Sequence, residues 1–342
     1  MAARTILHVG VMKSGTSHIQ SRLFENKQRL LEAGVLVPGR FWSHQVNAVE
    51  DLLRIQRHGP ERGNGDWQEV ADEIAAHPGT AVVSMEFLGP STAAEIAGVC
   101  STIPNVEAVI TVRDLNRTLA AMWQEAVQNG SSIGFRAYLD SVEETRAGSA
   151  LPPGPLAKPG GNFWRQQGLV RMARDWRAVA PLTVVTVPPP GASRSILWER
   201  FCQTLGVPAS GWADARRSNE SIGAASAMLL RQVNEVLEPH GVKKPARRVR
   251  KSVLAKQIMA RRKRDEPSIG LPVAAWVREQ ASQMLADLRQ IDLTLLGDWE
   301  ELQPAEVPGI DPRDVSQEEV IEAAAAALAG MIRRAGRNLP RD

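Results

Sequence analysis

Short apolar runs alternate with longer amphipathic stretches over the first 190 residues of the chain. Apolar recurrence at helical spacing follows the first of these runs and predicts a helix that ends before Gly34. Further helices are predicted over Trp67–Ala76, Ala93–Thr102, Arg117–Gln128 and Gly168–Ala180. The runs themselves are typical of buried strands and cover Thr5–Val9, Gly34–Val37, Thr80–Ser84, Val106–Val112 and Leu182–Val187. Strands that alternate with helices predict a parallel sheet of about five strands, covered on both faces.

Helical spacing dominates after residue 190. The expected helices are Leu197–Leu205, Ala224–Leu237, Val273–Leu288 and Glu318–Arg334. We therefore expect an α/β core over residues 1–190 and a helical C-terminal region over 191–342 that packs on it, in one domain rather than two. The Pro- and Gly-rich stretch Leu151–Asn162 interrupts the α/β pattern and is expected to be a surface loop.

Composition and cysteine usage narrow the class of protein. Hydrophobic residues make up 43% and charged residues 23% of the chain, as in ordinary globular proteins. No apolar stretch approaches the length that spans a bilayer, and the first residues resemble neither a signal peptide nor an anchor. Cys100 and Cys202 have no partner at metal-ligand spacing and are expected to be reduced, buried thiols, which favours a cytosolic (cytoplasmic) protein.

Basic residues gather in one stretch although the formal net charge of +3 is too small to predict nucleic-acid binding. Eleven of the twenty-two residues of Lys243–Arg264 are Lys or Arg. Two interpretations stay open for this stretch. It docks something anionic, or it is a solvated helix face whose apolar residues, near helical spacing, point inward. Those apolar residues are Val253, Leu254, Ile258 and Met259.

Candidate chemistry begins at the end of the first expected strand, in the segment His8–Gln20, HVGVMKSGTSHIQ. A strand that feeds a Gly/Ser/Thr loop opening into a helix can bind phosphate through backbone N–H groups and a lysine, here Lys13. The alternative is a tight turn with a helix cap. A Walker A loop is excluded, because Thr16 follows Gly15 where that loop requires lysine.

Lys13-Ser14-Gly15-Thr16-Ser17 resembles the 5′-phosphosulfate loop of sulfotransferases that use 3′-phosphoadenosine 5′-phosphosulfate (PAPS). In that family an arginine at the end of a strand binds the 3′-phosphate, and Arg113 stands at such a place in VITVRDLNRTLAAMWQE. Arg117 and the triplet Trp123-Gln124-Glu125 resemble the bacterial, actinomycete-like branch of the family. One departure is plain: Ala121 occupies the position of a serine that often shares the 3′-phosphate.

The segment Arg216–Gly223 resembles a stretch of the same bacterial branch. The resemblance assigns its arginine, Arg217, to the 3′-phosphate, while Asn219 and Ser221 are expected to cap the next helix. The family likeness runs from His8 to about Leu302, including a C-terminal GDWEEL with Asp298. It implies a P-loop-like sheet and a helical C-terminal region.

A sulfuryl transfer needs a base for the proton of the acceptor; Glu86 and His44 are the main candidates, ahead of the weaker His18 and His8. Glu86 follows the expected strand Thr80–Ser84 and matches a glutamate of the bacterial relatives; its alternative role is to orient the loop. His44 is the second candidate, in an expected loop with Phe41 and Trp42.

The resemblance implies transfer of a sulfuryl group from PAPS to a hydroxyl or amine of a small molecule or glycan, leaving adenosine 3′,5′-bisphosphate. It implies no metal, no nucleic-acid partner and no membrane span. Two other classes stay open: a nucleotide-dependent phosphotransferase, disfavoured by Thr16, and a non-catalytic nucleotide-binding protein of the same fold. Neither the acceptor nor the oligomeric state follows from the sequence.

Overall fold

The computed structural model describes residues 2–146, 159–193, 195–215, 221–241 and 244–337. Contacts group the chain into two compact units, each assembled from three stretches. The first unit comprises Met1–Asp114, Trp164–Ser218 and Glu279–Gln303, and the second comprises Leu115–Phe163, Asn219–Arg278 and Pro304–Asp342. The order of strands and helices along the sequence predicted one division of the chain, at residue 190. The contacts instead assemble each unit from stretches on both sides of residue 190.

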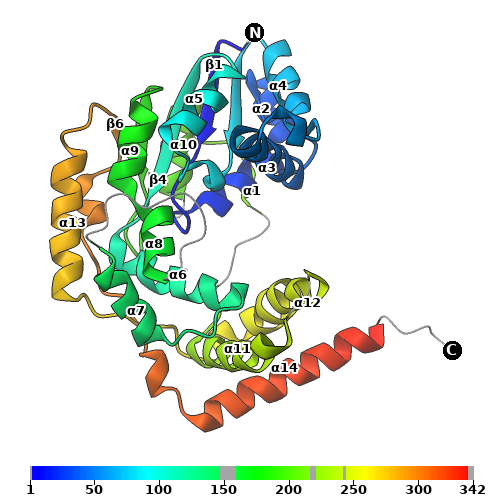
Figure 1. Ribbon diagram of the computed structural model, residues 1–342, viewed down its shortest axis with the longest axis vertical. Helices are drawn as coiled ribbons and strands as arrows, with labels where there is room; N and C mark the ends of the chain where they lie inside the picture. Colours follow the sequence, from blue (N-terminus) through cyan, green and yellow to red (C-terminus); the bar gives the residue numbers. More distant parts are fainter. Residues whose placement is uncertain (1, 147–158, 194, 216–220, 242–243, 338–342) are drawn as a thin grey trace. The chain divides into compact units, whose positions relative to one another are not determined.

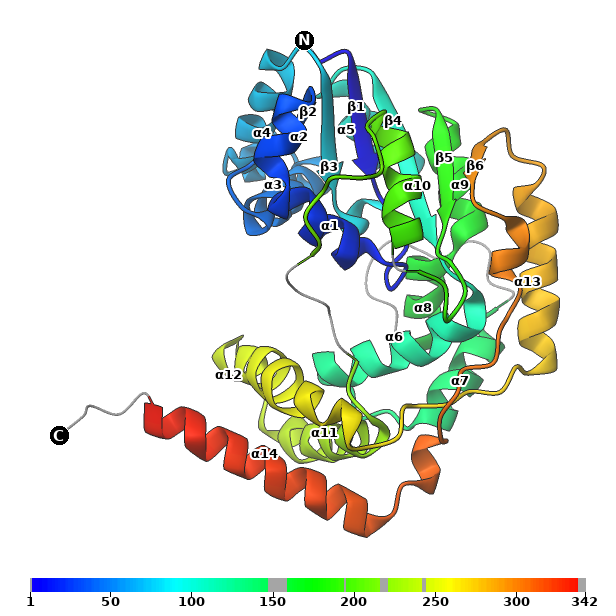
Figure 2. The same ribbon diagram turned by 180° about the vertical axis from the view of Figure 1, so that it is seen from behind.

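The first unit contains a six-stranded sheet in the order β2-β3-β1-β4-β5-β6, which Figure 2 labels strand by strand. Every neighbouring pair is parallel. The strands are β1 Arg4–His8, β2 Val35–Leu36, β3 Thr80–Ser84, β4 Val106–Val112, β5 Leu182–Thr186 and β6 Thr294–Leu296. The structure therefore confirms the parallel α/β fold, and five of its strands coincide with the apolar runs of the sequence.

Alternate strand residues supply two separate hydrophobic cores, one on each face of the sheet. In β1, Leu7 belongs to the first core and Ile6 to the second. In β3, Val83 and Val82 divide in the same way. A sheet buried on both faces favours apolar residues at successive positions of a strand, and this explains the apolar runs.

Helices cover both faces (Figure 1). Helices α1, α2 and α10 contribute to the second core, and α3, α4, α5, α9 and α13 contribute to the first. Their bounds are α1 Thr16–Glu25, α2 Lys27–Glu32, α3 Trp42–His58, α4 Asp66–Ala76, α5 Ala93–Ser101, α9 Leu169–Arg177, α10 Ser195–Leu205 and α13 Ala275–Leu288. Three short 3₁₀ turns also belong to this unit: η1 Pro60–Arg62, η2 Glu86–Leu88 and η6 Trp299–Leu302.

Strand order places a topological switch between β1 and β4. The chain leaves β1 toward β2 at one edge of the sheet, and it leaves β4 toward β5 and β6 at the other. In open parallel sheets, ligands bind outside the carboxyl ends of the strands at such a switch. The loop after β1 and the residues after β4 meet this description.

Several elements differ from the sequence expectations, among them helix α7 Phe135–Glu144, which was not expected. Strand β6 was not expected, because three partly exposed residues are too short for a periodic signal. Helix α3 occupies the segment where a loop around His44 was expected, so that expectation was wrong. Helix α8 spans Pro159–Gln167 and takes in the end of the expected Pro- and Gly-rich loop. Proline is tolerated in the first turn of a helix, where its missing N–H costs nothing. Residues 147–158 lie outside the described part of the chain.

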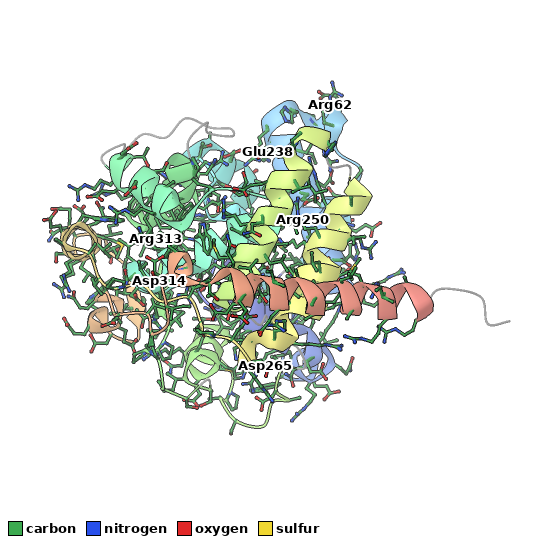
Figure 3. All side chains as sticks on the ribbon, turned by 90° about the horizontal axis from the view of Figure 1, so that it is seen from below. Arg62, Glu238, Arg250, Asp265, Arg313 and Asp314 are labelled. Carbon is green, nitrogen blue, oxygen red and sulfur yellow. The ribbon has the colours of Figure 1, made fainter. Side chains whose placement is uncertain are left out.

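The second unit is helical (Figure 3). Its elements include α6 Leu115–Asn129, α7 Phe135–Glu144, α11 Ala224–Leu237, α12 Lys244–Arg248 and α14 Gln317–Arg337, with the turns η3 Glu238–His240 and η7 Pro312–Asp314. The expected helices at Ala224–Leu237 and Glu318–Arg334 are confirmed. Among the described residues, no helix combines the length and the apolarity needed to cross a bilayer.

Helix α11 begins with a cap that was not expected. Its N-cap residue is Gly223, and Ser221 is exposed and supplies no cap. The carboxylate of Glu266 instead accepts the backbone N–H of Ser226 at 2.7 Å and also binds its hydroxyl. A Cβ on Gly223 would lie 2.2 Å from Glu266, so this capping requires glycine there. The second expected capping residue, Asn219, lies outside the described residues.

The basic stretch Lys243–Arg264 turns its apolar residues inward. It includes α12, a π-helix, η4 Val249–Ile258, and a 3₁₀ segment, η5 Met259–Arg264. Val253 and Met259 are buried, and Leu254 and Ile258 are half-buried. Two of its cations bind within the unit: Arg250 donates to the Asn129 carbonyl at 2.6 Å, and Lys251 lies 2.8 Å from Glu125. The inward apolar face is confirmed, and anion docking stays a prediction.

Both cysteines are free thiols, as expected. Cys202 is buried, as expected, but Cys100 is only half-buried, so the expectation that both are buried was wrong for Cys100. Burial raises the pKa of the Cys100 thiol to about 11 and that of Cys202 to about 12. Both are therefore protonated and unreactive near neutral pH.

Candidate active site

The loop between β1 and α1 has a backbone that few sequences adopt. Lys13 has a φ of 66°, in the left-handed region, although it is not glycine. Gly15, the N-cap residue of α1, has a φ of 83°, and a Cβ there would lie 2.4 Å from the Leu197 side chain. Gly15 is thus required by conformation and by space. A left-handed residue such as Lys13 costs free energy, and such residues concentrate at functional sites.

Side chains from other segments hold this loop. Gln167, at the end of α8, donates to the carbonyl of Met12 at 2.9 Å. The buried hydroxyl of Ser14 donates to the Val11 carbonyl at 2.5 Å and lies 2.8 Å from the hydroxyl of Thr111 in β4. The Ser14 side chain therefore anchors the loop, which leaves its backbone for the cofactor contact predicted from the sequence.

A buried polar chain continues from Thr111 across the sheet. The ring of His8 lies between two hydroxyls, with Nδ1 2.7 Å from Ser84 Oγ and Nε2 3.0 Å from Thr111 Oγ1. All three side chains are fully buried. The chain thus joins the ends of three adjacent strands, β3, β1 and β4, to the loop.

Proton counting fixes two bonds of this chain, because each hydroxyl has one proton to donate. Ser14 donates its proton to Val11, so Thr111 must donate to Ser14. Thr111 then accepts from His8 Nε2–H. Burial keeps His8 neutral, because it lowers the pKa of His8 from 6.5 to about 3. A neutral His8 that carries its proton on Nε2 accepts from Ser84 through Nδ1.

The start of helix α1 suits an anion. Its first turn contains no acidic residue, and its N-cap glycine has no side chain that could cap the first N–H groups. Those N–H groups and the helix dipole favour negative charge. Thr16 is buried, and Lys13 and Ser17 are half-buried beside it in sequence.

Glu86 lies two residues beyond β3 and opens the turn η2. Gln20 of α1, itself 4% exposed, donates through Nε2 to Glu86 Oε2 at 2.7 Å and to the Ser84 carbonyl at 3.1 Å. Gln20 is one helical turn beyond Thr16. The carboxylate is consequently tied to the helix that the candidate phosphate loop opens.

His44 lies in the first turn of α3, with both ring nitrogens in contact with protein groups. Its Nδ1 accepts the backbone N–H of Arg40 at 3.2 Å, and its Nε2 lies 3.4 Å from Glu69 of α4. Helix α3 also contacts the η2 turn that contains Glu86. These contacts give His44 a structural role at the start of α3; its part in catalysis stays a prediction.

Arg113 follows the last residue of β4 directly and is half-buried, so the expectation that it ends a strand is confirmed. Because β4 pairs with β1, Arg113 and the Gly10–Gly15 loop both leave the carboxyl edge of neighbouring strands. Arg217 lies outside the described residues, and its predicted role is untouched by the structure. Asp298 caps the η6 turn through Glu300 N–H at 2.9 Å.

Three supporting residues were missed in the sequence: His8 as a loop anchor, Gln20 and Gln167. For His8, the sequence did contain a signal. In three expected strands the central apolar run is followed by a polar residue at or near the carboxyl end, namely His8, Ser84 and Thr111. Parallel neighbours bring such ends together, and the register pairs His8 with Ser84. The two glutamines carry no comparable signal, because isolated glutamines on helices are usually exposed.

A comparison with solved structures gives a distant likeness. Among solved structures, the chain is similar to a sulfotransferase from Alicyclobacillus acidocaldarius, with 13% sequence identity and a TM-score of 0.41. That match covers 72% of this chain and all of the other. No protein-family model and no curated protein sequence matches the chain. A likeness of this size carries no functional weight, so the function has to be inferred from the residues of the site.

Proposed function

We propose that this chain is a sulfotransferase that moves a sulfuryl group from PAPS to a hydroxyl or amine of a small molecule or glycan, leaving adenosine 3′,5′-bisphosphate. One observation carries the proposal: the loop Gly10–Gly15 is anchored by buried side chains at the switch point of the sheet and opens into the uncapped, acid-free start of α1. The motif Lys13–Ser17 supports the same reading.

The residues present fit an anionic cofactor at this place. Gly10 has no space for a side chain, since a Cβ would lie 2.2 Å from Thr111 Oγ1. Gly15 requires glycine as well. A backbone so constrained keeps its N–H groups in one arrangement, which is what binding of a phosphate or sulfate group requires.

Each residue has a proposed role. Lys13, Thr16, Ser17 and the backbone of Ser14 and Gly15 hold the 5′-phosphosulfate end, with Lys13 supplying positive charge where negative charge grows. Arg113 holds the 3′-phosphate, and Arg217 is a second candidate for that group. When bound, PAPS supplies an activated sulfuryl group.

Glu86 is proposed to accept the proton of the acceptor, with Gln20 fixing the carboxylate through one oxygen. A carboxylate accepts hydrogen bonds through both oxygens, so this bond orients Glu86 without exhausting it. His44 is the alternative base, and its contacts to Arg40 and Glu69 make it the weaker candidate.

Ligand ranking tests the proposal. We expect adenosine 3′,5′-bisphosphate to raise the melting temperature more than ATP with Mg²⁺ or NAD does at the same concentration, because a ligand that binds the folded state more tightly stabilises it more. Lys13→Ala should reduce the rise in melting temperature that adenosine 3′,5′-bisphosphate causes. Preference for ATP with Mg²⁺ would favour a phosphotransferase instead. Turnover of PAPS with a panel of acceptors then separates an enzyme from a non-catalytic nucleotide-binding protein.

A further inference from the structure

Helix α14 buries its small residues and exposes its large ones. Toward α11 and η4 it presents Val320, Ala323, Ala327 and Gly330, which are buried. A Cβ on Gly330 would lie 2.6 Å from Ile258, so the helix packs closely on η4. Figure 3 shows α14 lying across α11 and η4. On the opposite side of the helix, three large aliphatic side chains are exposed.

The exposed side chains form one stripe. Ile321, Leu328 and Ile332 are 67%, 63% and 62% exposed, and Ala325 between them is exposed as well. Their spacing of 4, 3 and 4 residues is that of the a and d positions of a coiled coil. At 1.5 Å per residue the stripe is about 16 Å long. Singly exposed apolar residues are common, whereas a continuous stripe marks an interaction surface.

Charge along α14 is divided between its halves. The N-terminal half carries Glu318 and Glu322 beside the stripe, and the C-terminal half carries Arg333. At 100° per residue, these three lie on the same flank of the stripe. All three are exposed. Helices that pair in antiparallel orientation bring the same flanks together with opposite ends adjacent, whereas parallel helices place like ends side by side.

We propose that α14 pairs antiparallel with α14 of a second copy of this chain, about a two-fold axis near residues 326 and 327. In this register Ile321 packs against the partner's Ile332, and Ala325 against the partner's Leu328. Glu322 then faces the partner's Arg333, and symmetry repeats the pair. A two-fold interface of this kind buries the same patch on both copies.

The short stripe sets the expected strength. Two helices that meet over four apolar positions bury less than the roughly 1,200–2,000 Å² of standard stable complexes. We therefore expect a weak dimer with a dissociation constant on the order of 10 µM or higher. The charge pairs at the rim select orientation more than they add affinity.

Sedimentation velocity of the full chain from about 5 to 500 µM tests the pairing. Wild type should pass from monomer to dimer, and Leu328→Lys should shift the dissociation constant upward by at least about tenfold. Val236→Lys is the matched control, because Val236 is 68% exposed on α11 in the same unit but outside the stripe. It should dimerise like wild type. Circular dichroism confirms that both variants remain folded.

Charge exchange tests the orientation. Glu322→Arg should weaken the dimer, and adding Arg333→Glu to it should restore the dimer, because the pair is rebuilt with reversed signs. A monomer at every concentration would overturn the proposal, as would a dimer that survives Leu328→Lys. Wild type that stays monomeric but sediments with phosphatidylcholine–phosphatidylglycerol vesicles would show instead that a membrane surface covers the stripe.

Discussion

The hydroxyl of Ser14 lies 2.8 Å from the hydroxyl of Thr111, although 97 residues separate them in sequence. This contact joins the candidate phosphate loop to the strand that leads to Arg113. It is one link in the chain Ser84–His8–Thr111–Ser14–Val11, in which proton counting and the neutral state of the buried His8 leave one direction for every bond. The loop is thus held by a network that works only when each member is present.

Replacing Thr111 with valine tests this network, because valine keeps the shape and removes the hydroxyl. We expect Thr111→Val to lower the free energy of unfolding by about 1–3 kcal/mol, since His8 Nε2–H and Ser14 lose a buried partner. Urea denaturation measures the change. Thr5→Val is the matched control: Thr5 is fully buried in β1, and its hydroxyl has no hydrogen-bond partner among the described residues. Equal losses in both variants would contradict the network.

Stability should fall in mild acid because of His8. Its pKa is about 3 in the folded chain against 6.5 unperturbed, so the unfolded chain takes up the proton first as the pH falls. The contribution of His8 is complete above about pH 6.5 and declines by about 1.4 kcal/mol per pH unit below it, or about 2 kcal/mol at pH 5. Urea denaturation between pH 5 and 7 measures the slope. His8→Gln should flatten it, and the exposed His58→Gln should not; equal slopes in all three would exclude His8 as the cause.

Lys13→Ala should lower kcat for sulfuryl transfer by on the order of 10²-fold or more, because the ammonium meets charge that develops only during transfer. The fold should be unaffected. Lys263→Ala, the same change at an exposed lysine of the second unit, is the control and should keep wild-type kcat. Full activity in Lys13→Ala would remove the loop from the mechanism.

Arg113→Ala should weaken binding of adenosine 3′,5′-bisphosphate and spare adenosine 5′-phosphate, which lacks the 3′-phosphate. A charge-assisted contact is worth about 1.5–3 kcal/mol, or roughly 10- to 150-fold in the dissociation constant. Titration calorimetry with both ligands measures the difference. If both ligands lose affinity equally, Arg113 does not recognise the 3′-phosphate.

Glu86→Gln should lower turnover by about 10²- to 10⁴-fold with cofactor affinity nearly intact, because the amide cannot accept a proton. In that case His44→Ala should mainly change the binding of the acceptor. If His44 is the base instead, the loss of turnover should appear in His44→Ala and not in Glu86→Gln. Wild-type kcat in Glu86→Gln, measured where chemistry limits turnover, would leave Glu86 a structural residue.

The sequence by itself determined the α/β alternation, five of the six strands and the helices that carry a clear apolar face. Burial on both faces favours apolar residues at successive positions, as at Ala108–Ile110 in β4, and this pattern is visible in one dimension. The same pattern showed that the Lys13–Ser17 motif lies between a strand and a helix. Helix α3 could not be predicted, because buried polar residues such as Gln45 and Asp51 hide its helical period. Strand β6 could not be predicted, because it is too short to show a period.

Only the tertiary structure decided which distant residues serve the loop. Strand order brings His8, Ser84 and Thr111 to adjacent strand ends, and packing places Gln20 on Glu86 and Gln167 on Met12. Packing also turned the small residues of α14 inward and left Ile321, Leu328 and Ile332 exposed. The physical reason is the same in each case. Periodicity records whether a side chain is buried, but the partner of a buried hydroxyl, amide or imidazole depends on contacts between segments far apart in the chain.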